Sequence, residues 1–503
     1  MNDMKKALQV LPILFFTAFA SAQSWQSSLV KLNSSGDFVY TPDEKGNAIP
    51  DFSAVGYFHG ERDIPSVKSV QYVKPGENDQ QRIQEAIDMV SKKPTDQYGF
   101  RGAVELLPGT YKIPGTLHID SSGVILRGAG AETKLIATGT DQRSLIVVAG
   151  TGGIKEIART RKTILDQFIP CGANAIRLNN TNSLKPGDRV IVWMQAKDNW
   201  IHDLKMDSIV PAVDTKQWTA QGYAFQFERT ILGIKGNAIL LDNPLVMELD
   251  QQYFETAVYA YQFTGRINQV GIENLTCISA YEAETAENHA WVAIEMNKIE
   301  NGWVRNVDAF HFGYACVFLK DFAKNITVQD SKMIDPKSLI TGSRRYSFNN
   351  DGQQNLVQRC YAKGGRHDFV TGSRVCGPNV FYNCKAEKVN SDIGPHHRWT
   401  MGTLYDNIIT DGDINVRDRG NMGSGHGWVG VTQVLWNCMA AKIISQDPWV
   451  SGKNYVIGGN YKLGEYKLKR KESFKEGNGQ PGLMPESLYA AQLKQRLKQS
   501  SAR

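Results

Sequence analysis

The segments that decide the fold are six copies of one pattern: WVRNVDA (303–309), NITVQDS (325–331), NLVQRCYA (355–362), NVFYNCKA (379–386), TLYDNII (403–409) and QVLWNCMA (433–440). Superposed on one template, at intervals of 24, 29, 24, 23 and 31 residues, they align Val307, Ser331, Cys360, Cys384, Asn407 and Cys438. An earlier copy, IENLTCI, begins at Ile272. This period, with one or two β segments per repeat, predicts an all-β chain folded as a right-handed parallel β-helix whose coils stack on one another. Leucine-rich repeats share the period, but their regular leucine framework is absent.

Upstream of these copies, the first coils are expected within residues 23–159. GAVELLPGTYKI (102–113) and LHIDSSGVILRGAG (117–130) alternate apolar residues and break at Gly, Pro or Asn, as short strands do. Just before them, residues 79–87 carry apolar positions at helical spacing, with Asp79 as the candidate N-cap. We therefore expect a helix that caps one end of the β-helix.

Residues 160–266 interrupt the coils and predict a small β-rich insertion. LKPGDRVIVW (184–193) and RTILGIKGNAILLDNPL (229–245) have strand character, and Lys235-Gly236-Asn237 is a good hairpin turn. The main coils then occupy residues 267–461. The tail, residues 462–503, is basic and ends in a helix with Tyr489, Leu493 and Leu497 on one stripe, which either packs on the last coils or stays loose on the surface.

Composition and the N-terminus limit the function classes. The chain has 503 residues, 41% hydrophobic and 21% charged, which excludes wholesale disorder, and its net charge of +6 suits an acidic partner. No basic block indicates nucleic acid, and no later apolar run is long enough for a membrane span. Residues 1–22 are typical of a signal peptide cleaved after Ala22, which predicts a periplasmic or secreted protein. The seven cysteines include no CxxC pair, so most are expected to be buried and free.

Several motifs together resemble the pectate-lyase-like superfamily of right-handed β-helix proteins: DFSAVGY (51–57), the helix at 79–87, AVELLPGTYKI (103–113) and GVILRGAG (123–130). The resemblance implies this fold and places the chain near carbohydrate-active proteins, but the superfamily includes lyases, hydrolases, epimerases and tailspikes. Asn350-Asp351-Gly352 and Gly425-His426-Gly427 partly match polygalacturonase motifs, whose DD pair and RIK motif are missing. The vWiDH segment of calcium-dependent pectate lyases is also absent.

Histidines recur once per coil just before a β segment, at His289, His311, His367, His397 and His426, with Arg345 in the equivalent place between the second and third. Their spacing follows the coil period, so these side chains are expected along one face. A face lined with imidazole and guanidinium groups suits an anionic polymer. The alternative is that repeated His and Asn side chains only close the turns.

The densest polar stretches, residues 394–399, 415–421 and 425–428, predict a site for β-elimination on a uronate-containing glycan. That reaction needs neutralisation of the carboxylate, a base for the neighbouring C–H and an acid for the departing oxygen. The candidates are His397 or His426 as base, Arg398, Arg417 or Arg419 as carboxylate clamp, Asn421 as a further donor, and Tyr405 or Tyr346 as acid. Further substrate contacts are expected from Arg344, Arg345, His367, His396, Trp399 and Trp428.

Two other classes stay open beside an exported polysaccharide lyase. A glycoside hydrolase would use two carboxylates from Asp351, Asp368, Asp392, Asp411, Asp413 and Asp418. A glycan-binding β-helix without turnover would more naturally spread aromatic residues evenly along the face. No cofactor is required, although Asp411, Asp413 and Asp418 could offer oxygen ligands to calcium.

Overall fold

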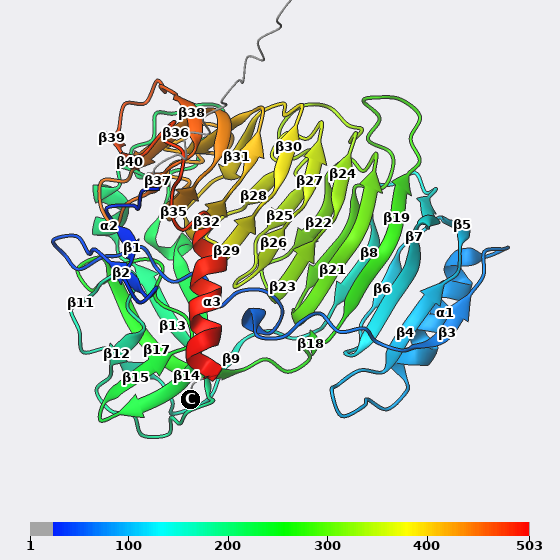
Figure 1. The fold of residues 1–503 in the computed structure, drawn as a ribbon, viewed down its shortest axis with the longest axis horizontal. Coiled ribbons are helices and arrows are strands. Elements are labelled where there is room, and N and C mark those ends of the chain that lie inside the picture. Colours follow the sequence, from blue (N-terminus) through cyan, green and yellow to red (C-terminus); the bar gives the residue numbers. More distant parts are fainter. Residues whose placement is uncertain (1–23, 502–503) are drawn as a thin grey trace, which may run out of the picture.

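Parallel strands stack in three columns along most of the chain, as a computed structural model of residues 24–501 shows (Figure 1). One column runs through β4, β7, β19, β21, β23, β26, β29, β32, β35 and β37, and a second through β24, β27, β30 and β33. The third runs through β6, β8, β20, β22, β25, β28, β31 and β34. Because these pairings are parallel and each strand bonds to its equivalents one coil before and one coil after, the fold is a parallel β-helix. The predicted signal peptide lies outside the described residues.

The N-terminal elements are β1 (Val30–Leu32), β2 (Phe38–Tyr40), the helical turn η1 (Tyr57–Gly60), β3 (Ser69–Val73), α1 (Asp79–Ser91), β4 (Gly102–Leu106), β5 (Gly109–Ile113), β6 (Leu117–Ile119), β7 (Val124–Ala137) and β8 (Ser144–Ala149). The expected helix is present as α1, which covers the first coils at one end of the stack (Figure 1). Its buried residues Ile83, Ile87 and Val90 join the apolar interior of the coils. The N-cap, however, is Asn78 in a left-handed conformation, whereas the Asp79 carboxylate accepts the N–H groups of Gly76 and Lys112.

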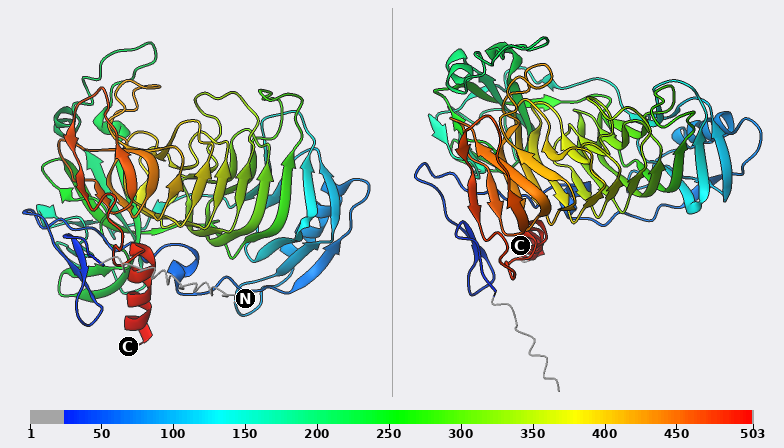
Figure 2. Two further views of the ribbon diagram at one scale, coloured as in Figure 1. Left: turned by 45° about the horizontal axis from the view of Figure 1, so that its top comes forward. Right: turned by 90° about the horizontal axis from the view of Figure 1, so that it is seen from above.

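The insertion holds β9 (Lys155–Glu156), β10 (Lys162–Thr163), β11 (Phe168–Ile169), β12 (Ala175–Arg177), β13 (Arg189–Ala196), α2 (Asp198–Asp203), the turn η2 (Ala220–Gly222), β14 (Ala224–Lys235), β15 (Ala238–Leu241), β16 (Leu249–Asp250) and β17 (Phe254–Gln262). Its strands pair antiparallel, with β13 between β14 and β17, and β14 turns into β15 through Gly236 and Asn237. The insertion lies against the C-terminal coils (Figure 2). Trp200 and Phe254 of the insertion share one buried cluster with Trp399 and Trp428 of the coils.

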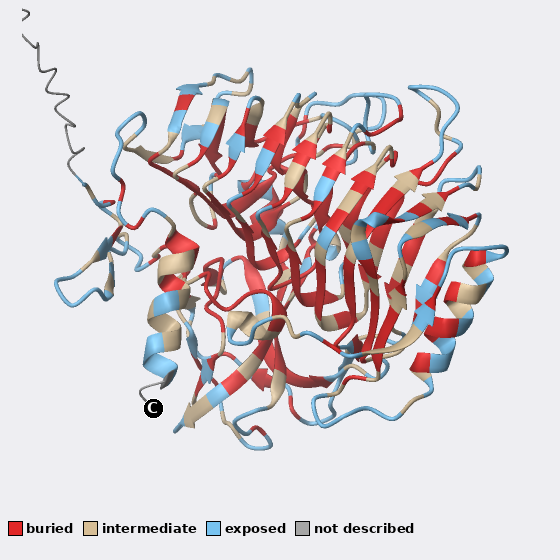
Figure 3. Ribbon diagram, turned by 45° about the vertical axis from the view of Figure 1, so that its right-hand side comes forward, coloured by how far each residue is buried: buried red, intermediate tan, exposed pale blue. Residues whose placement is uncertain are grey.

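The main coils consist of β18 (Ile267–Asn268), β19 (Gly271–Ser279), β20 (Val292–Asn297), β21 (Ile299–Phe310), β22 (Ala315–Leu319), β23 (Ala323–Gln329), β24 (Lys332–Ile334), β25 (Phe348–Asn350), β26 (Leu356–Gln358), β27 (Tyr361–Lys363), β28 (Phe369–Thr371), β29 (Cys376–Tyr382), β30 (Lys385–Glu387), β31 (Asp392–Pro395), β32 (Thr400–Asp406), β33 (Ile409–Thr410), β34 (Asp413–Val416), β35 (Gly430–Trp436), β36 (Met439–Asp447), β37 (Tyr455–Ile457) and β38 (Asn460–Leu463). The chain closes with β39 (Lys471–Glu472), β40 (Phe474–Glu476) and α3 (Leu488–Ser501). Figure 3 shows the buried residues concentrated along the inside of the coils.

The repeat alignment holds in all copies but one. Strand register pairs Lys385 with Ile409 and Ile409 with Met439, so the equivalent of Cys384 and Cys438 is Ile408 and not Asn407. A shift of one residue moves a strand side chain to the other face, and Ile408 is fully buried. Asn407 instead occupies the left-handed corner position, which Asn306, Asp330, Arg359, Asn383 and Asn437 fill in the other coils.

The terminal helix α3 packs on the coils and is not a loose surface element. Leu488 and Tyr489 are buried against Leu404 and Trp436. The Asp406 carboxylate accepts the Tyr489 N–H at 2.8 Å, which satisfies a free donor at the start of the helix. All seven cysteines are buried and free, as expected. Among residues 24–501, no helix is both long and apolar enough to cross a membrane.

Candidate active site

Four histidines gather where the third column of strands passes from β28 to β34. His367 precedes β28, His396 and His397 follow β31, and His426 lies in the loop between β34 and β35. Their ring centroids are 4.6 Å apart for His367 and His396, 4.9 Å for His396 and His426, and 5.0 Å for His397 and His426. We call these four residues the histidine cluster.

The other two predicted members of the histidine row lie elsewhere. His289 is buried and bonded to the Ser279 hydroxyl and to the Lys337 carbonyl. His311 lies beside Asp335 at 3.5 Å and against Tyr281. The coil period therefore identified three cluster members, and His396 adds the fourth.

Asp392 is the charged centre beneath the cluster. Its carboxylate accepts hydrogen bonds from His367 Nδ1 at 2.8 Å and Asn415 Nδ2 at 2.7 Å, and it forms a buried ion pair with Arg419. Burial opposes the charge of Asp392, but Arg419 and His367 together hold the pKa of its carboxyl well below the usual range. A buried carboxylate is retained here because its partners are fixed around it.

His367 is a positioning residue. Its Nδ1 donates to Asp392, and its Nε2 accepts a hydrogen bond from Arg366 Nη1 at 2.7 Å. Burial lowers the pKa of His367, so the ring is neutral and this hydrogen-bond pattern defines its tautomer. Because both ring nitrogens are occupied, His367 has no lone pair left to take a proton from a substrate.

The remaining three imidazoles are neutral and only partly bonded. Burial and the neighbouring His426 lower the pKa of His397 to about 3, and burial and Arg419 lower the pKa of His426 to about 4. Burial also holds the pKa of His396 well below its usual value. The Nδ1 atoms of all three rings are buried without a hydrogen-bond partner. Neutral imidazoles keep a lone pair for a proton, and because pKa values this low make them weak bases, they need a nearby negative charge, such as a substrate carboxylate, to become stronger ones.

Tyr346 lies beside the histidine cluster, two residues before β25. Its hydroxyl lies 3.0 Å from His396 Nε2, and its ring packs edge-on against His367 at 4.9 Å between centroids. Burial raises the pKa of Tyr346, so the hydroxyl is protonated at neutral pH, and it can donate to or accept from His396 Nε2 according to the tautomer of the neutral imidazole. Of the two predicted candidates for the acid, Tyr346 lies beside the histidine cluster.

A cleft of about 590 Å³ opens beside the cluster, between the insertion and the third column. Its walls include His396 and His397 of the histidine cluster, the neighbouring Tyr346, and Gln226 from the insertion. Asp351 also lines it; burial and the neighbouring Asp321 raise the pKa of Asp351 to about 7. The buried Oδ1 atom of Asp351 has no hydrogen-bond partner.

The predicted cations divide into two groups. Arg417 and Arg419 are buried beside Asp392, yet both keep a buried Nε without a hydrogen-bond partner. Arg398 donates to the Ser424 carbonyl and hydroxyl, and Asn421 lies half-buried in the same loop.

Arg344 and Arg345 are engaged away from the cluster. Arg344 forms a two-point ion pair with Glu287. Arg345 donates to the Ser338 carbonyl and fixes its own loop, so the structure gives it a structural role.

Three predicted site residues are wrong for geometric reasons. Tyr405 is fully buried and stacks on Phe381 inside the coils at 5.3 Å between centroids, so it cannot act as acid on a glycan. Trp399 and Trp428 are also fully buried, at the junction with the insertion. Trp399 packs edge-on against Trp200, and the Trp428 indole donates to the Leu204 carbonyl, so neither ring face is available to a sugar.

The candidate calcium ligands point to separate partners. Asp411 accepts the Lys388 N–H, Asp413 pairs with Lys442, and Asp418 pairs with Arg470. Within the described part of the chain, no group of three or more acidic, His or Cys side chains is arranged to hold a metal ion. These three aspartates also do not form a catalytic pair.

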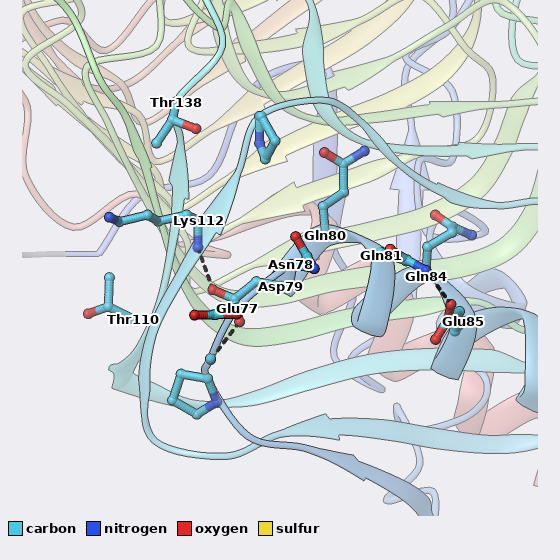
Figure 4. Close-up of a pocket in the computed structure, with 13 residues that line it drawn as sticks. Glu77, Asn78, Asp79, Gln80, Gln81, Gln84, Glu85, Thr110, Lys112 and Thr138 are labelled. Carbon is cyan, nitrogen blue, oxygen red and sulfur yellow. Dashed lines mark hydrogen bonds between the residues drawn. The ribbon is translucent and has the colours of Figure 1, made fainter.

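Another cleft, of about 1180 Å³, lies at the start of α1 (Figure 4). Asp79 there accepts the N–H groups of Gly76 and Lys112, and Gln81 donates to Glu85. These polar groups satisfy one another, and they hold the capping helix to the first coils.

Sequence reasoning missed three contributors to the site. Arg366 sets the His367 tautomer, and Tyr314 and Trp291 form an aromatic surface beside Tyr346. The signal for the two aromatics was present, because both stand directly before a strand of the third column, two and three residues after His289 and His311. Arg366 carried no such signal, although its partner His367 is the next residue in the chain.

No protein-family model matches this chain, and no curated protein matches its sequence. Among solved structures, it is similar to an alginate lyase from Paenibacillus sp. str. FPU-7, with 9% identity over 81% of this chain and 99% of that chain and a TM-score of 0.39. A polygalacturonase from Erwinia carotovora ssp. carotovora shares 11% identity over 82% of this chain and 96% of that one, with a TM-score of 0.38. The tailspike of E. coli bacteriophage HK620, solved with a pentasaccharide, shares 10% identity over 87% of this chain and 61% of its own, with a TM-score of 0.39. At these values the likenesses carry no argument about activity.

Proposed function

We propose that this protein is an exported polysaccharide lyase that cleaves an acidic, uronate-containing glycan by β-elimination. The observation that carries the proposal is the hydrogen-bonded pair of neutral Tyr346 and neutral His396, beside a second neutral imidazole, His397, in one cleft. This arrangement offers a proton donor and proton acceptors close together at neutral pH.

In the proposed reaction, His397 removes the proton from the carbon next to the uronate carboxylate. The electron pair forms a carbon–carbon double bond and expels the glycosidic oxygen, which takes the proton of Tyr346. His396 supports the Tyr346 hydroxyl, and the proton on His397 returns to solvent before Tyr346 is reprotonated. The unpaired N–H groups of Arg417 and Arg419 favour negative charge at the cluster.

The test combines ultraviolet absorbance of an unsaturated uronate with new reducing ends, using polygalacturonate, alginate and hyaluronan as substrates. Both signals should rise on one of them for the protein without residues 1–22. Tyr346→Phe and His397→Gln should each lower kcat by about 10²–10⁴-fold. His311→Gln is the matched control, because that histidine lies outside the cluster, and it should retain activity. Full activity in both cluster variants would contradict the assignment.

Hydrolysis is the second candidate, because Asp351 lines the same cleft with a pKa raised to about 7, and Asp321 lies near it. A carboxyl group with such a pKa can serve as the general acid of a glycosidase. In that case reducing ends would appear without ultraviolet absorbance, and Asp351→Asn would abolish activity. A lyase that uses Tyr346 and His397 should survive Asp351→Asn.

The pH profile separates the two mechanisms independently of the variants. A base with a pKa of about 3, as for His397, is deprotonated across the neutral range, so lyase activity should persist down to about pH 4. A hydrolase that needs Asp351 protonated should lose activity as the pH rises through about 7. A profile that falls above neutral pH together with loss of activity in Asp351→Asn would favour hydrolysis.

A further inference from the structure

An aromatic surface leads from the histidine cluster toward the N-terminal coils. It consists of Trp291, Tyr314, Phe318 and Tyr346, which we call the aromatic row. Trp291 precedes β20, Tyr314 precedes β22, and Tyr346 lies just before β25, so the row crosses three successive coils of the third column.

The rings of the row are arranged as a continuous surface. Trp291 and Tyr314 lie nearly parallel, with an angle of 6° and centroids 6.5 Å apart. Tyr314 lies 5.1 Å from Tyr346 and 5.5 Å from Phe318. Tyr346 in turn contacts His396 through its hydroxyl, so the row reaches the proposed catalytic pair without a gap.

The row differs from the aromatic residues that build the core. Trp399 and Trp428 are fully buried, whereas Trp291, Tyr314 and Phe318 are all partly exposed. Gly313 is what makes room for Trp291, because a Cβ at this glycine would lie 3.0 Å from the indole. A contiguous, partly exposed aromatic surface that ends in a polar cleft is typical of a ligand site and is not needed to close the coils.

Charged and polar groups flank the rings. Arg344, which is paired with Glu287, lies over Trp291 at 5.7 Å from the ring centroid. Lys320 lies over Phe318 at 4.5 Å and 3.8 Å from the Glu295 carboxylate. Asn349 donates to the Tyr314 hydroxyl at 2.9 Å. Flat apolar faces bordered by ion pairs and an amide suit a sugar ring, because its C–H face packs on the aromatic ring and its polar groups, a carboxylate among them, meet the flanking charged and amide groups.

The opposite side of the cluster offers no such surface. Tyr466, from the segment after β38, stacks on the Arg417 guanidinium at 3.8 Å, and its hydroxyl reaches Met422. Leu468 packs on the 417–422 turn, because a Cβ at Gly420 would lie 2.7 Å from it. The C-terminal segment therefore covers the turn that follows the cluster, while the row stays open.

We infer that the aromatic row binds the acidic glycan on one side of the cleaved bond, with the glycan chain running along the coil axis toward α1. This inference rests on the proposed function for the position of the cleaved bond. Coils stack about 4.8 Å apart, so the row extends the site over two coils beyond the catalytic pair. Oligosaccharides long enough to reach Trp291 should therefore bind better than shorter ones.

The experiment measures KM and kcat for Trp291→Leu and Tyr314→Ala on polygalacturonate, alginate and hyaluronan, and on size-fractionated oligosaccharides of whichever polymer is cleaved. We expect KM for long chains to rise about tenfold or more, with kcat and the KM of the shortest cleaved oligosaccharide little changed. Trp291→Leu keeps an apolar side chain but removes the flat ring. Trp449→Ala is the matched control, because Trp449 is 41% exposed and lies outside the row.

Binding is measured separately, by calorimetry of the inactive Tyr346→Phe protein with the same polymers. Weaker binding when Trp291→Leu is added to Tyr346→Phe supports the row even if the reaction is not a lyase reaction. Cleavage with an unchanged KM in both row variants overturns the row and leaves the proposed function standing. If none of the three polymers is bound or cleaved, both proposals fail.

Discussion

The interior of the coils and the histidine cluster on their outside come from the same repeats but treat polar atoms in opposite ways. Inside, Ser331 donates to the Gln329 carbonyl, and Cys360 and Cys384 contact the equivalent carbonyls two residues before them. In the cluster, three imidazoles and two guanidinium groups keep buried nitrogens without a partner. Single buried atoms without a partner also occur inside the coils, as at the Tyr405 hydroxyl, but only around the cluster do several imidazoles and guanidinium groups share this feature among the described residues, which indicates a site shaped for a ligand.

Two buried aspartates make this contrast measurable. Asp368 and Asp392 stand at the starts of neighbouring coils of the third column, and both are almost fully buried. Asp392 is ionised against Arg419, whereas Asp368 has only the Ser347 hydroxyl as a side-chain partner, and burial raises its pKa to about 7. The same side chain is therefore part of an ion network in one coil and close to neutral in the other.

The largest effect is expected from Asp392→Asn. This change leaves Arg419 buried without its counter-charge and should lower the free energy of unfolding by about 3–5 kcal/mol. His367 keeps the backbone carbonyl of residue 392 as an acceptor at 2.7 Å but loses the negative charge beside it, so activity should fall with stability. Urea unfolding at neutral pH checks the first expectation. A loss below about 1 kcal/mol would show that Arg419 finds solvent or another partner.

The next effect concerns Asp368→Asn and pH. A carboxyl group whose pKa is higher in the folded than in the unfolded protein stabilises the fold at low pH and loses that contribution as the pH rises through its folded pKa. As the pH rises from about 4 to about 7, the raised pKa of Asp368 should therefore lower the free energy of unfolding of the wild type by up to about 4 kcal/mol. Unfolding at several pH values should therefore show a shallower decline for Asp368→Asn.

Asp392→Asn is the control for the sign of that pH effect. The folded pKa of Asp392 is depressed, so its stabilising contribution is present above its unfolded pKa and is lost only in acid. If Asp368→Asn declines as steeply as the wild type, the pH dependence must come from Asp351 and Asp406, whose pKa values are also raised to about 7.

A smaller effect is expected at the corners of the coils. Asn383 has a φ of 52°, and an L-residue without a local hydrogen-bonding side chain pays about 1–2 kcal/mol for this conformation. Asn383→Ala should therefore destabilise the protein by about 1 kcal/mol, whereas Asn383→Gly should be nearly neutral. Thermal unfolding of the two variants gives the difference. Equal loss in both would mean that the Asn383 side chain, and not the backbone, matters.

The coil repeat made the interior predictable, because each coil imposes the same alternation of side chains. That logic failed at Asn407, where an Asn like those at other corners occupies the corner and Ile408 the interior. The cluster was predicted only in part. His367, His397 and His426 follow the coil period, but the insertion buries Trp399 and Trp428, and a local pattern contains no information on where a distant segment packs.

The smallest effect on stability is expected from a substitution inside the coils. Cys384 is buried in the ladder where Ser331 stands two coils earlier, and its thiol lies 3.4 Å from the Tyr382 carbonyl. A serine there finds an acceptor at the same place as Ser331, so Cys384→Ser should cost only about 1 kcal/mol despite complete burial. Ile408→Ser, one coil later, removes apolar volume as well and should cost clearly more. If both variants unfold at the same urea concentration, the contact with the carbonyl two residues earlier contributes nothing to stability. The interior would then tolerate a polar side chain for another reason.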